Sequence, residues 1–296
     1  MNAIAPQERF FSLNGLRFHA IDWGGPRRPS TRPARSIVLL HGLASQAHIW
    51  DLVAPQLAER ARVIALDQRG HGLSDKPDDG YDFASVTRDL NRFLDETKIE
   101  RPILIGHSWG GNVALDYAAQ QPERVAGLVF VDGGFLEIGS RLDWSSAERM
   151  LEPPDLAGMP LATLQANLRG WLGPAWGEAT ASMVLNNFEV LSDQTIRPHL
   201  RKVNHMKVVR AIWEHRPSQL YEKVRCPVLL IPAIQPGPHD EHLRTLLDAK
   251  REAVALAERR LARSRTLWME DTLHDIPLHR PDELARAIEE FVAEVE

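Results

Sequence analysis

The chain has 296 residues and a hydrophobic content of 44%, which suffices for one large globular domain or for a domain that carries a sizeable insertion. Its net charge of −5 excludes the basic footprint of a protein that binds nucleic acid or an anionic membrane. No apolar run approaches the roughly 20 residues of a membrane span, and the first residues lack a signal-peptide pattern, so we expect a cytoplasmic protein.

The first half of the chain alternates predicted strands and helices. Asn14-Gly15 between two apolar runs predicts a hairpin whose turn needs positive φ. A loop is expected over 24–35. Further strands are predicted over 36–40, 63–66, 102–105 and 125–131, and helices over 49–60, 83–97 and 111–119. These strands are apolar throughout, which predicts an α/β fold with a mainly parallel sheet covered by helices on both faces.

The alternation breaks between residues 134 and 223. This stretch contains several prolines, no clear strand, and predicted helices over 161–171 and 206–215. The sheet pattern then resumes with strands over 228–231 and 265–269 and helices over 243–262 and 281–295. We therefore predict a core formed by 1–133 and 224–296, with a helical cap over 134–223.

The segment Gly106-His107-Ser108-Trp109-Gly110 fits the G-x-S-x-G pattern of a nucleophile elbow. An apolar strand is predicted before it and a helix after it, which is the context that the pattern requires. The flanking glycines allow a tight turn in which a Cβ would clash. The segment therefore predicts Ser108 as a nucleophile and the backbone N–H of Trp109 as a donor to the reacting carbonyl oxygen.

A serine hydroxyl needs a base. His274 lies between the last predicted strand and the last helix, which places it at the same edge of the sheet as Ser108, and we predict it as that base. The backbone N–H of Leu43 is the expected second oxyanion donor, because it follows the strand over 36–40. His41 is expected to hold this loop by hydrogen bonds.

With these features the sequence resembles the α/β-hydrolase superfamily in its cap-bearing branch, over nearly the whole chain. The resemblance rests on four motifs: His41-Gly42 followed by Trp50; the run from Asp67 to Ser74; the elbow with Gly111; and His274 followed by Pro281. It implies a Ser-His-Asp hydrolase that cleaves an ester-type bond through an acyl-enzyme. Asp67, Arg69 and His71 are then expected to brace the site.

The acid of the triad is not obvious. Most relatives carry it in the turn after the strand that follows the cap, but here residues 232–238 contain no carboxylate and Asp240 is the first. The alternative is Asp132, after the strand before the cap, a position that some relatives use. We favour Asp132, because a carboxylate at the end of a buried strand needs a partner and His274 would be one. A cap-hinge role for Asp132 and a catalytic role for Asp240 stay open.

The cap is expected to supply an apolar pocket for a small, neutral ester or lactone. Serine in place of aspartate at the nucleophile excludes dehalogenase and epoxide hydrolase chemistry, which leaves Trp109 as a pocket wall. A lactonase, a carbon–carbon bond hydrolase, a perhydrolase and a slow-turnover ligand receptor remain alternatives. We expect no cofactor and no metal, and a structural role for the single cysteine, Cys226. The candidate pocket residues, each of which could instead pack the cap on the core, are Trp144, Met150, Leu151, Trp171, Trp176, Met183 and Phe188.

Overall fold

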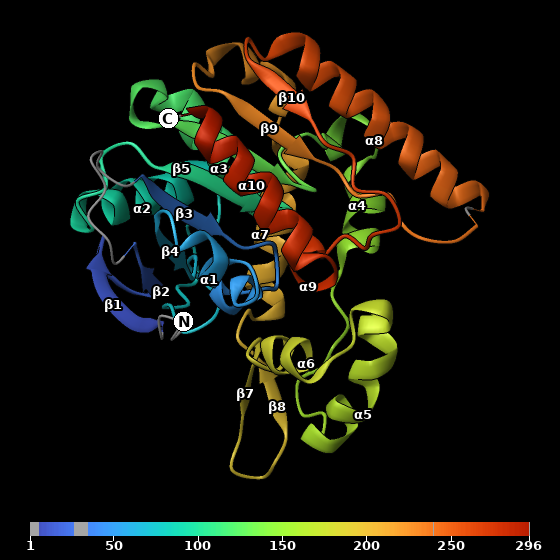
Figure 1. Ribbon diagram of the computed structural model, residues 1–296. Helices are drawn as coiled ribbons and strands as arrows, with labels where there is room; N and C mark the ends of the chain where they lie inside the picture. The colour runs from blue at the N-terminus through green and yellow to red at the C-terminus, as the bar shows by residue number, and fades with distance from the viewer. Residues whose placement is uncertain (1–5, 27–34, 239, 296) are drawn as a thin grey trace.

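The computed structural model describes residues 6–26, 35–238 and 240–295. Most of the loop predicted over 24–35 lies outside these residues. Eight strands form one sheet in the order β1-β2-β4-β3-β5-β6-β9-β10 (Figure 1). Their bounds are β1 (Gln7–Leu13), β2 (Leu16–Gly24), β3 (Ser36–Leu40), β4 (Arg62–Leu66), β5 (Ile103–His107), β6 (Gly127–Val131), β9 (Val228–Ile231) and β10 (Ser264–Thr266).

The sheet is parallel except at its amino-terminal edge. β1 pairs with β2 and β2 with β4 in antiparallel fashion, while the remaining neighbours from β4 to β10 are parallel. The predicted hairpin is confirmed, because Asn14 and Gly15 have φ values of 52° and 78°. The predicted fold class, a mainly parallel α/β sheet, is confirmed as well.

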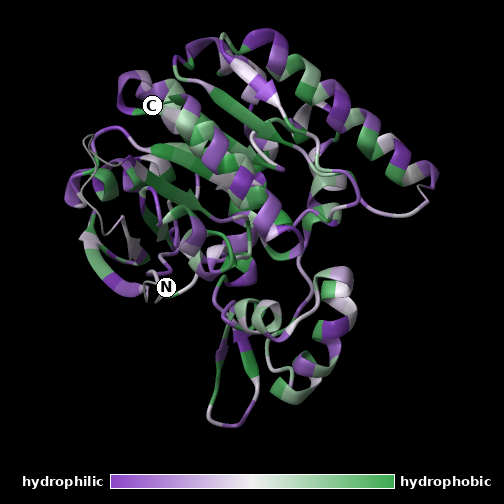
Figure 2. Ribbon diagram, viewed as in Figure 1, coloured by the Kyte–Doolittle hydropathy of each residue, from purple (hydrophilic) through white to green (hydrophobic). Residues whose placement is uncertain are grey.

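Helices cover both faces of the sheet. Alternate residues of the central strands enter two different apolar cores: in β3, Val38 and Leu40 pack in one, and Ile37 and Leu39 in the other. This double burial explains why the central strands are apolar along their length (Figure 2). One face carries α2 (Phe83–Glu96), α3 (Trp109–Gln120) and α8 (Glu241–Arg260), and the other carries α1 (Ala54–Leu57), α9 (Ile276–His279) and α10 (Pro281–Val295).

Two predictions about local structure are wrong. The helix expected over 49–60 is split into a 3-10 turn, Ala47–Trp50, and the short α1. Pro55 explains the break, because its ring restricts the residue before it and it has no N–H to continue a helix. The stretch 134–223 also contains strands: β7 (Phe188–Val190) and β8 (Ile196–Pro198) form an antiparallel hairpin. Three-residue strands are too short to show a periodic pattern.

The chain leaves the sheet after β6 and returns to it at β9. Between them lie α4 (Trp144–Leu151), α5 (Leu161–Leu172), α6 (Glu178–Leu185) and α7 (Lys202–Glu214). α5, α6 and the β7-β8 hairpin form a lobe beside the sheet (Figure 1), with a small apolar core of Leu164, Leu168 and Ile196. The division into core and cap domains stays a prediction.

Asn112 of α3 connects the two ends of this inserted segment. Its Oδ1 accepts a hydrogen bond from the N–H of Gly134 at 3.2 Å, and its Nδ2 lies 3.1 Å from Nδ1 of His215. The segment is thus tied to the core near its first residue and just after α7. Among the described residues, no helix combines the length and apolar character needed to cross a bilayer.

Candidate active site

Ser108 and Asp132 lie side by side at the carboxyl edge of the parallel strands. The N–H of Ser108 donates to the carbonyl of Val131 at 2.9 Å, and the N–H of Asp132 donates to the carbonyl of Ile231 at 2.9 Å. Each residue directly follows its strand, so the ladder that pairs β5, β6 and β9 continues into the site. This edge is where open α/β sheets place their ligands.

The turn at Ser108 is tight and strained. Its φ of 51° and ψ of −120° are rare for a residue with a side chain and cost on the order of 1–3 kcal/mol. A Cβ on Gly106 would lie 2.2 Å from the carbonyl oxygen of Gly110, and a Cβ on Gly110 would lie 2.4 Å from that of Leu40. The two glycines of the pattern are therefore sterically required, because backbone fills the space beside each of them.

Two backbone segments border Ser108. Trp109 is the first residue of α3, so its N–H has no acceptor within the helix. A Cβ on Gly42 would lie 3.1 Å from the Cβ of Ser108, so the loop that leads into Leu43 runs directly beside the serine. These are the two positions expected of oxyanion donors. The Trp109 side chain is buried and stacks on the ring of His71, with centroids 5.2 Å apart.

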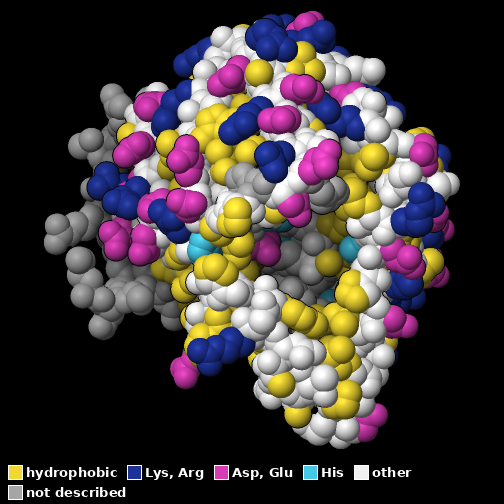
Figure 3. All heavy atoms as spheres, turned by 90° about the vertical axis from the view of Figure 1, so that its right-hand side faces the viewer, with side chains coloured by type: hydrophobic (Ala, Val, Ile, Leu, Met, Phe, Trp, Pro, Cys, Tyr) yellow, Lys and Arg dark blue, Asp and Glu magenta, His cyan; other side chains and the backbone are white. Residues whose placement is uncertain are grey.

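A cleft of about 120 Å³ opens beside Leu43, and we call it the Leu43 cleft. It lies between the loop after β3, helix α6 of the inserted segment, and α9. Figure 3 shows the molecule hollowed between the lobe and the sheet, with histidine side chains visible in the hollow. The residues that line the Leu43 cleft are Leu43, Ala44, Ser45, Ile49, Met183, Val184, Asn187, Asp275 and Leu278.

Asp132 and His274 are in direct contact. Nδ1 of His274 lies 2.7 Å from Oδ2 of Asp132, although 142 residues separate them in the chain. The loop after β10 brings the histidine there: Met269 pairs with Ala233, and the N–H of Thr272 donates to the carbonyl of Ile234 at 2.9 Å. Nδ1–H donates to the carboxylate in this arrangement, which leaves Nε2 of the neutral ring free to accept a proton.

The two partners differ in exposure. The Asp132 side chain is 3% exposed, whereas that of His274 is 49% exposed. Burial raises the pKa of Asp132, but the hydrogen bond and charge of His274 and the ammonium of Lys250 outweigh it and lower the pKa to about 2. Desolvation lowers the pKa of His274, but the hydrogen bond and charge of Asp132 outweigh it and raise the pKa above its ordinary value. An acid that is ionised near neutral pH thus holds a basic, accessible imidazole.

Asp240, the alternative acid, lies elsewhere. It is exposed and is the N-cap residue of α8, where its Oδ1 accepts from the N–H of Leu243 at 2.8 Å. This is the ordinary role of an aspartate at a helix start. The structure therefore brings Asp132 to His274 and leaves Asp240 at a helix end.

The sequence analysis missed two residues that lie beside Asp132 and His274. Lys250 of α8 places Nζ 2.8 Å from Oδ1 and 3.0 Å from Oδ2 of Asp132. His107 lies at the end of β5, and its Nε2 is 3.0 Å from the carbonyl of His274. Burial lowers the pKa of His107 to about 4, so its ring stays neutral beside His274. A lysine in the middle of a polar helix carries no sequence signal that would link it to Asp132, 118 residues away.

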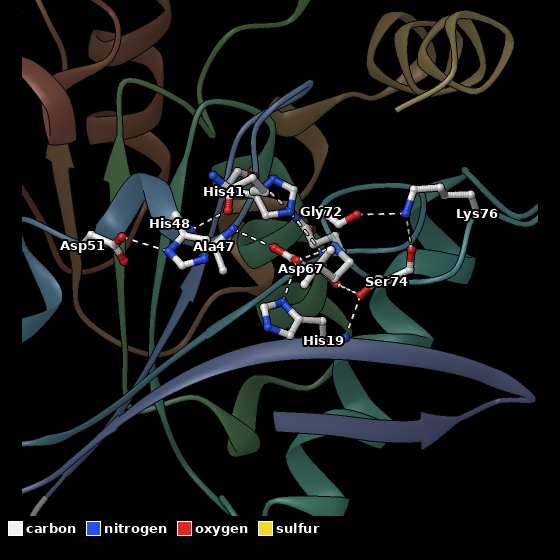
Figure 4. Close-up of polar contacts among 12 residues, drawn as sticks. His19, His41, Ala47, His48, Asp51, Asp67, Gly72, Ser74 and Lys76 are labelled. Atoms are coloured by element: carbon white, nitrogen blue, oxygen red, sulfur yellow. Dashed lines mark hydrogen bonds and ion pairs between the residues drawn. The ribbon is translucent and has the colours of Figure 1, made fainter. Parts of the chain in front are cut away.

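The motif from Asp67 to Ser74 forms a bracing loop, and Asp67 is its centre (Figure 4). The Asp67 carboxylate accepts from the N–H of Ala47 at 2.7 Å and of Leu73 at 2.8 Å, and lies 2.8 Å from Nδ1 of His19. Burial raises the pKa of Asp67, but these hydrogen bonds and the nearby histidines outweigh it and lower the pKa to about 2. One buried charge thus connects β2, the loop after β3 and the loop after β4.

His41 belongs to the same bracing network. Its Nδ1 lies 2.8 Å from the carbonyl of Gly42, while its Nε2 accepts from the N–H of Gln68 at 3.0 Å. Both ring nitrogens are occupied by backbone groups, and burial lowers the pKa of the ring. His41 therefore fixes the loop that carries Leu43, and neither of its nitrogens is free to act as a base.

The candidate pocket residues lie in different surroundings. Met183 lines the Leu43 cleft. Phe188 packs on the apolar core of the lobe, and Trp144 packs edge-on against Trp213. The carbonyl of Leu151 lies 3.0 Å from Nε2 of His205. The remaining three are exposed: Met150, Trp171 and Trp176. Their part in substrate binding stays a prediction.

The described residues contain no group of three His, Cys, Asp or Glu side chains arranged to hold a metal. His239, a histidine without metal-ligand spacing in the sequence, lies outside these residues. Cys226 is buried, and burial raises the pKa of its thiol to about 12, so the thiol is un-ionised near neutral pH.

Comparison with known families identifies the class of protein to which this fold and the elbow at Ser108 belong. Residues 35–228 match the family model of the α/β hydrolase fold, which is more than half of the chain. The chain belongs to this family, and the resemblance seen in its motifs is confirmed.

Individual relatives share parts of the sequence or the whole fold. Epoxide hydrolase A of Mycobacterium tuberculosis is 35% identical over 127 residues, which are 42% of this chain and 38% of that protein, well under two thirds of its length. The crystal structure of E-2-(acetamidomethylene)succinate hydrolase has a TM-score of 0.78 at 20% identity and covers 98% of this chain and 100% of that one. The enol-lactonase of Burkholderia xenovorans LB400 has a TM-score of 0.72 at 19% identity, with coverage of 96% and 100%. Both solved structures therefore resemble this chain in fold.

Proposed function

We propose that this protein is a serine hydrolase that cleaves an ester-type bond of a small apolar molecule through an acyl-enzyme. The observation that carries the proposal is the contact of 2.7 Å between His274 and the buried Asp132 at the sheet edge where Ser108 stands on its strained turn. Nucleophile, base and acid then come from the loops after β5, β10 and β6. This is the arrangement of roles by which a serine triad is recognised.

In this mechanism Ser108 Oγ attacks the carbonyl carbon of the substrate while Nε2 of His274 takes the hydroxyl proton. The N–H groups of Leu43 and Trp109 donate hydrogen bonds to the oxyanion that forms. The protonated imidazole then gives its proton to the leaving alcohol, and the acyl group remains on Ser108. His274 next removes a proton from water, the resulting hydroxide attacks the acyl carbon, and Ser108 recovers its proton from the imidazole as the acid leaves.

Asp132 keeps the imidazole in the tautomer with the proton on Nδ1 and stabilises the imidazolium that forms in each half of the cycle. The inserted segment 134–223 acts as the cap in this proposal. It supplies Met183 and Val184 to the Leu43 cleft beside an oxyanion donor. With Ile49 and Leu278 these side chains make one wall apolar, which favours an acyl or ring group without charge.

The test is the Ser108→Ala variant against a p-nitrophenyl acyl ester. We expect the variant to lose hydrolysis, with Ser182→Ala, an exposed serine of α6, as the matched control that keeps it. A Ser108→Ala variant that retains most of the wild-type rate contradicts the proposal. A panel of esters, lactones and β-diketones then separates an esterase from a lactonase and from a carbon–carbon bond hydrolase. A burst of product followed by almost no steady-state turnover would indicate a slow-turnover receptor.

A further inference from the structure

A lysine from a helix on the face of the sheet reaches the buried acid of the proposed triad. Nζ of Lys250 lies 2.8 Å from Oδ1 and 3.0 Å from Oδ2 of Asp132, and 2.9 Å from the carbonyl oxygen of Ala233. An ammonium group has three N–H donors. All three therefore have an acceptor, and all three acceptors belong to the site or to the turn beside it.

These contacts restrict the Asp132 carboxylate from both sides. Oδ1 accepts from the N–H of Ala233 at 3.0 Å and from Lys250, while Oδ2 faces both Lys250 and Nδ1 of His274. Rotation of the carboxylate would break bonds at both oxygens at once. The turn after β9, which contains no carboxylate before Asp240, contributes the N–H and the carbonyl of Ala233 instead.

The pair is withdrawn from solvent. The side chain of Lys250 is 17% exposed and that of Asp132 is 3% exposed. Exposed ion pairs contribute little because water screens them, whereas charges held in a buried site interact strongly and over a longer range. The ammonium of Lys250 is therefore close enough to the imidazole of His274, and sufficiently shielded from water, to influence its protonation.

Three charged groups act on the pKa of His274, and a fourth titratable group, the ring of His107, lies beside it. Asp132 and Asp275 favour its protonated form, Lys250 disfavours it, and the ring of His107 lies at a centroid distance of 4.9 Å. Since His107 stays neutral, Lys250 is the cation that opposes the two carboxylates. A general base has to be unprotonated at the working pH. Without the lysine the imidazole would hold its proton to a higher pH.

We propose that Lys250 is a positioning residue of this site: its ammonium fixes the Asp132 carboxylate in the orientation that receives Nδ1–H of His274, and its charge opposes those of Asp132 and Asp275 around the imidazole. This inference rests on the proposed function. The hydrogen bonds of Lys250 go to Asp132 and to the carbonyl of Ala233, so we expect it to act through Asp132.

The experiment measures the pKa of His274 by NMR in the Ser108→Ala background, where no turnover is needed. We expect the pKa to rise in Lys250→Met and to stay unchanged in Arg251→Gln, the matched control. Arg251 is the next residue of α8, and its exposed side chain pairs with Asp248 at 3.3 Å. Because the readout does not depend on activity, it tests Lys250 even if Ser108 proves not to be a nucleophile.

Kinetics on the Ser108 enzyme provide the second readout. The acidic limb of the kcat/KM profile should move to higher pH in Lys250→Met and stay in place in Lys250→Arg, which keeps the charge. General base catalysis contributes about 10²- to 10⁴-fold to a rate. The plateau of kcat/KM in Lys250→Met should fall by a smaller factor than this. A folded Lys250→Met variant with an unmoved His274 pKa and an unmoved acidic limb overturns the proposal.

Loss of Lys250 leaves Asp132 with a buried charge and less compensation, which is destabilising. If Lys250→Met does not fold, the comparison moves to Asp132→Asn and the double variant Asp132→Asn/Lys250→Met, which leaves neither charge unpaired. The pKa of His274 should be higher in the double variant than in Asp132→Asn, because the double variant lacks the cation. Equal pKa values in these two variants would refute the electrostatic role.

Discussion

Replacing Asp132 by asparagine conserves the shape of the side chain and removes its charge. The amide oxygen has to take the place of Oδ1, because the backbone N–H of Ala233 donates there, whereas Lys250 contacts both oxygens of the carboxylate. The amide NH₂ then occupies the place of Oδ2, opposite Nδ1 of His274. An NH₂ group donates, so Nδ1 becomes an acceptor and the ring proton moves to Nε2. In this tautomer His274 cannot take a proton from Ser108.

The structure sets the scale of the effect. The pKa of Asp132 is about 2, against an ordinary value of 3.8, and this difference corresponds to about 2 kcal/mol in favour of the ionised carboxylate. The wrong tautomer adds a larger kinetic loss, because the ring proton of His274 has to move from Nε2 to Nδ1 before every turnover. Such a substitution in a serine triad lowers kcat by about 10⁴-fold. That corresponds to about 5 kcal/mol of transition-state stabilisation.

The assay is steady-state hydrolysis of a p-nitrophenyl acyl ester, with folding checked by circular dichroism because the variant leaves Lys250 unpaired. Asp240→Asn is the matched control, since asparagine caps a helix as well as aspartate does and α8 should keep its first turn. We expect Asp240→Asn to stay within about twofold of the wild type, which is well below the 1.36 kcal/mol of a tenfold change. If Asp240→Asn lost more activity than a folded Asp132→Asn, the assignment of the acid would be wrong.

Two further predictions follow from charges at and near the site. Because the pKa of His274 is raised above 6.5, kcat/KM should increase with pH through an apparent pKa above 6.5; a limb centred below that value would contradict the contact with Asp132. Asp67→Asn should lower the free energy of unfolding by about 3–5 kcal/mol, since it removes a buried carboxylate that partners His19 and two backbone N–H groups. The pKa of Asp67 is lowered to about 2, so its contribution is present above pH 3.8 and is lost as the pH falls toward 2; denaturant unfolding at pH 7 and pH 3 should show a smaller difference at pH 3, and an equal difference at both would refute this account.

The elbow shows how far sequence alone reaches. Gly106 and Gly110 could be interpreted without a structure because backbone geometry requires them locally, and the structure finds backbone atoms 2.2 and 2.4 Å from their Cβ positions. The same holds for the hairpin at Asn14-Gly15, where two successive residues have positive φ. The helix expected over 49–60 shows the limit of an apolar pattern, because Pro55 breaks the backbone that the pattern assumes.

The sequence by itself determined the mainly parallel sheet, the turn at Ser108 and the loops that bring a histidine and a carboxylate to its edge, because these depend on the periodicity of apolar residues and on local backbone sterics. Only the tertiary structure decided which carboxylate meets His274. Asp132 and Asp240 were both compatible with the order of residues in the chain, and the distinction depends on which strand ends adjoin in the sheet. The tertiary structure also places Lys250 against Asp132. A contact across 118 residues depends on how α8 packs against the strands and leaves no pattern along the chain.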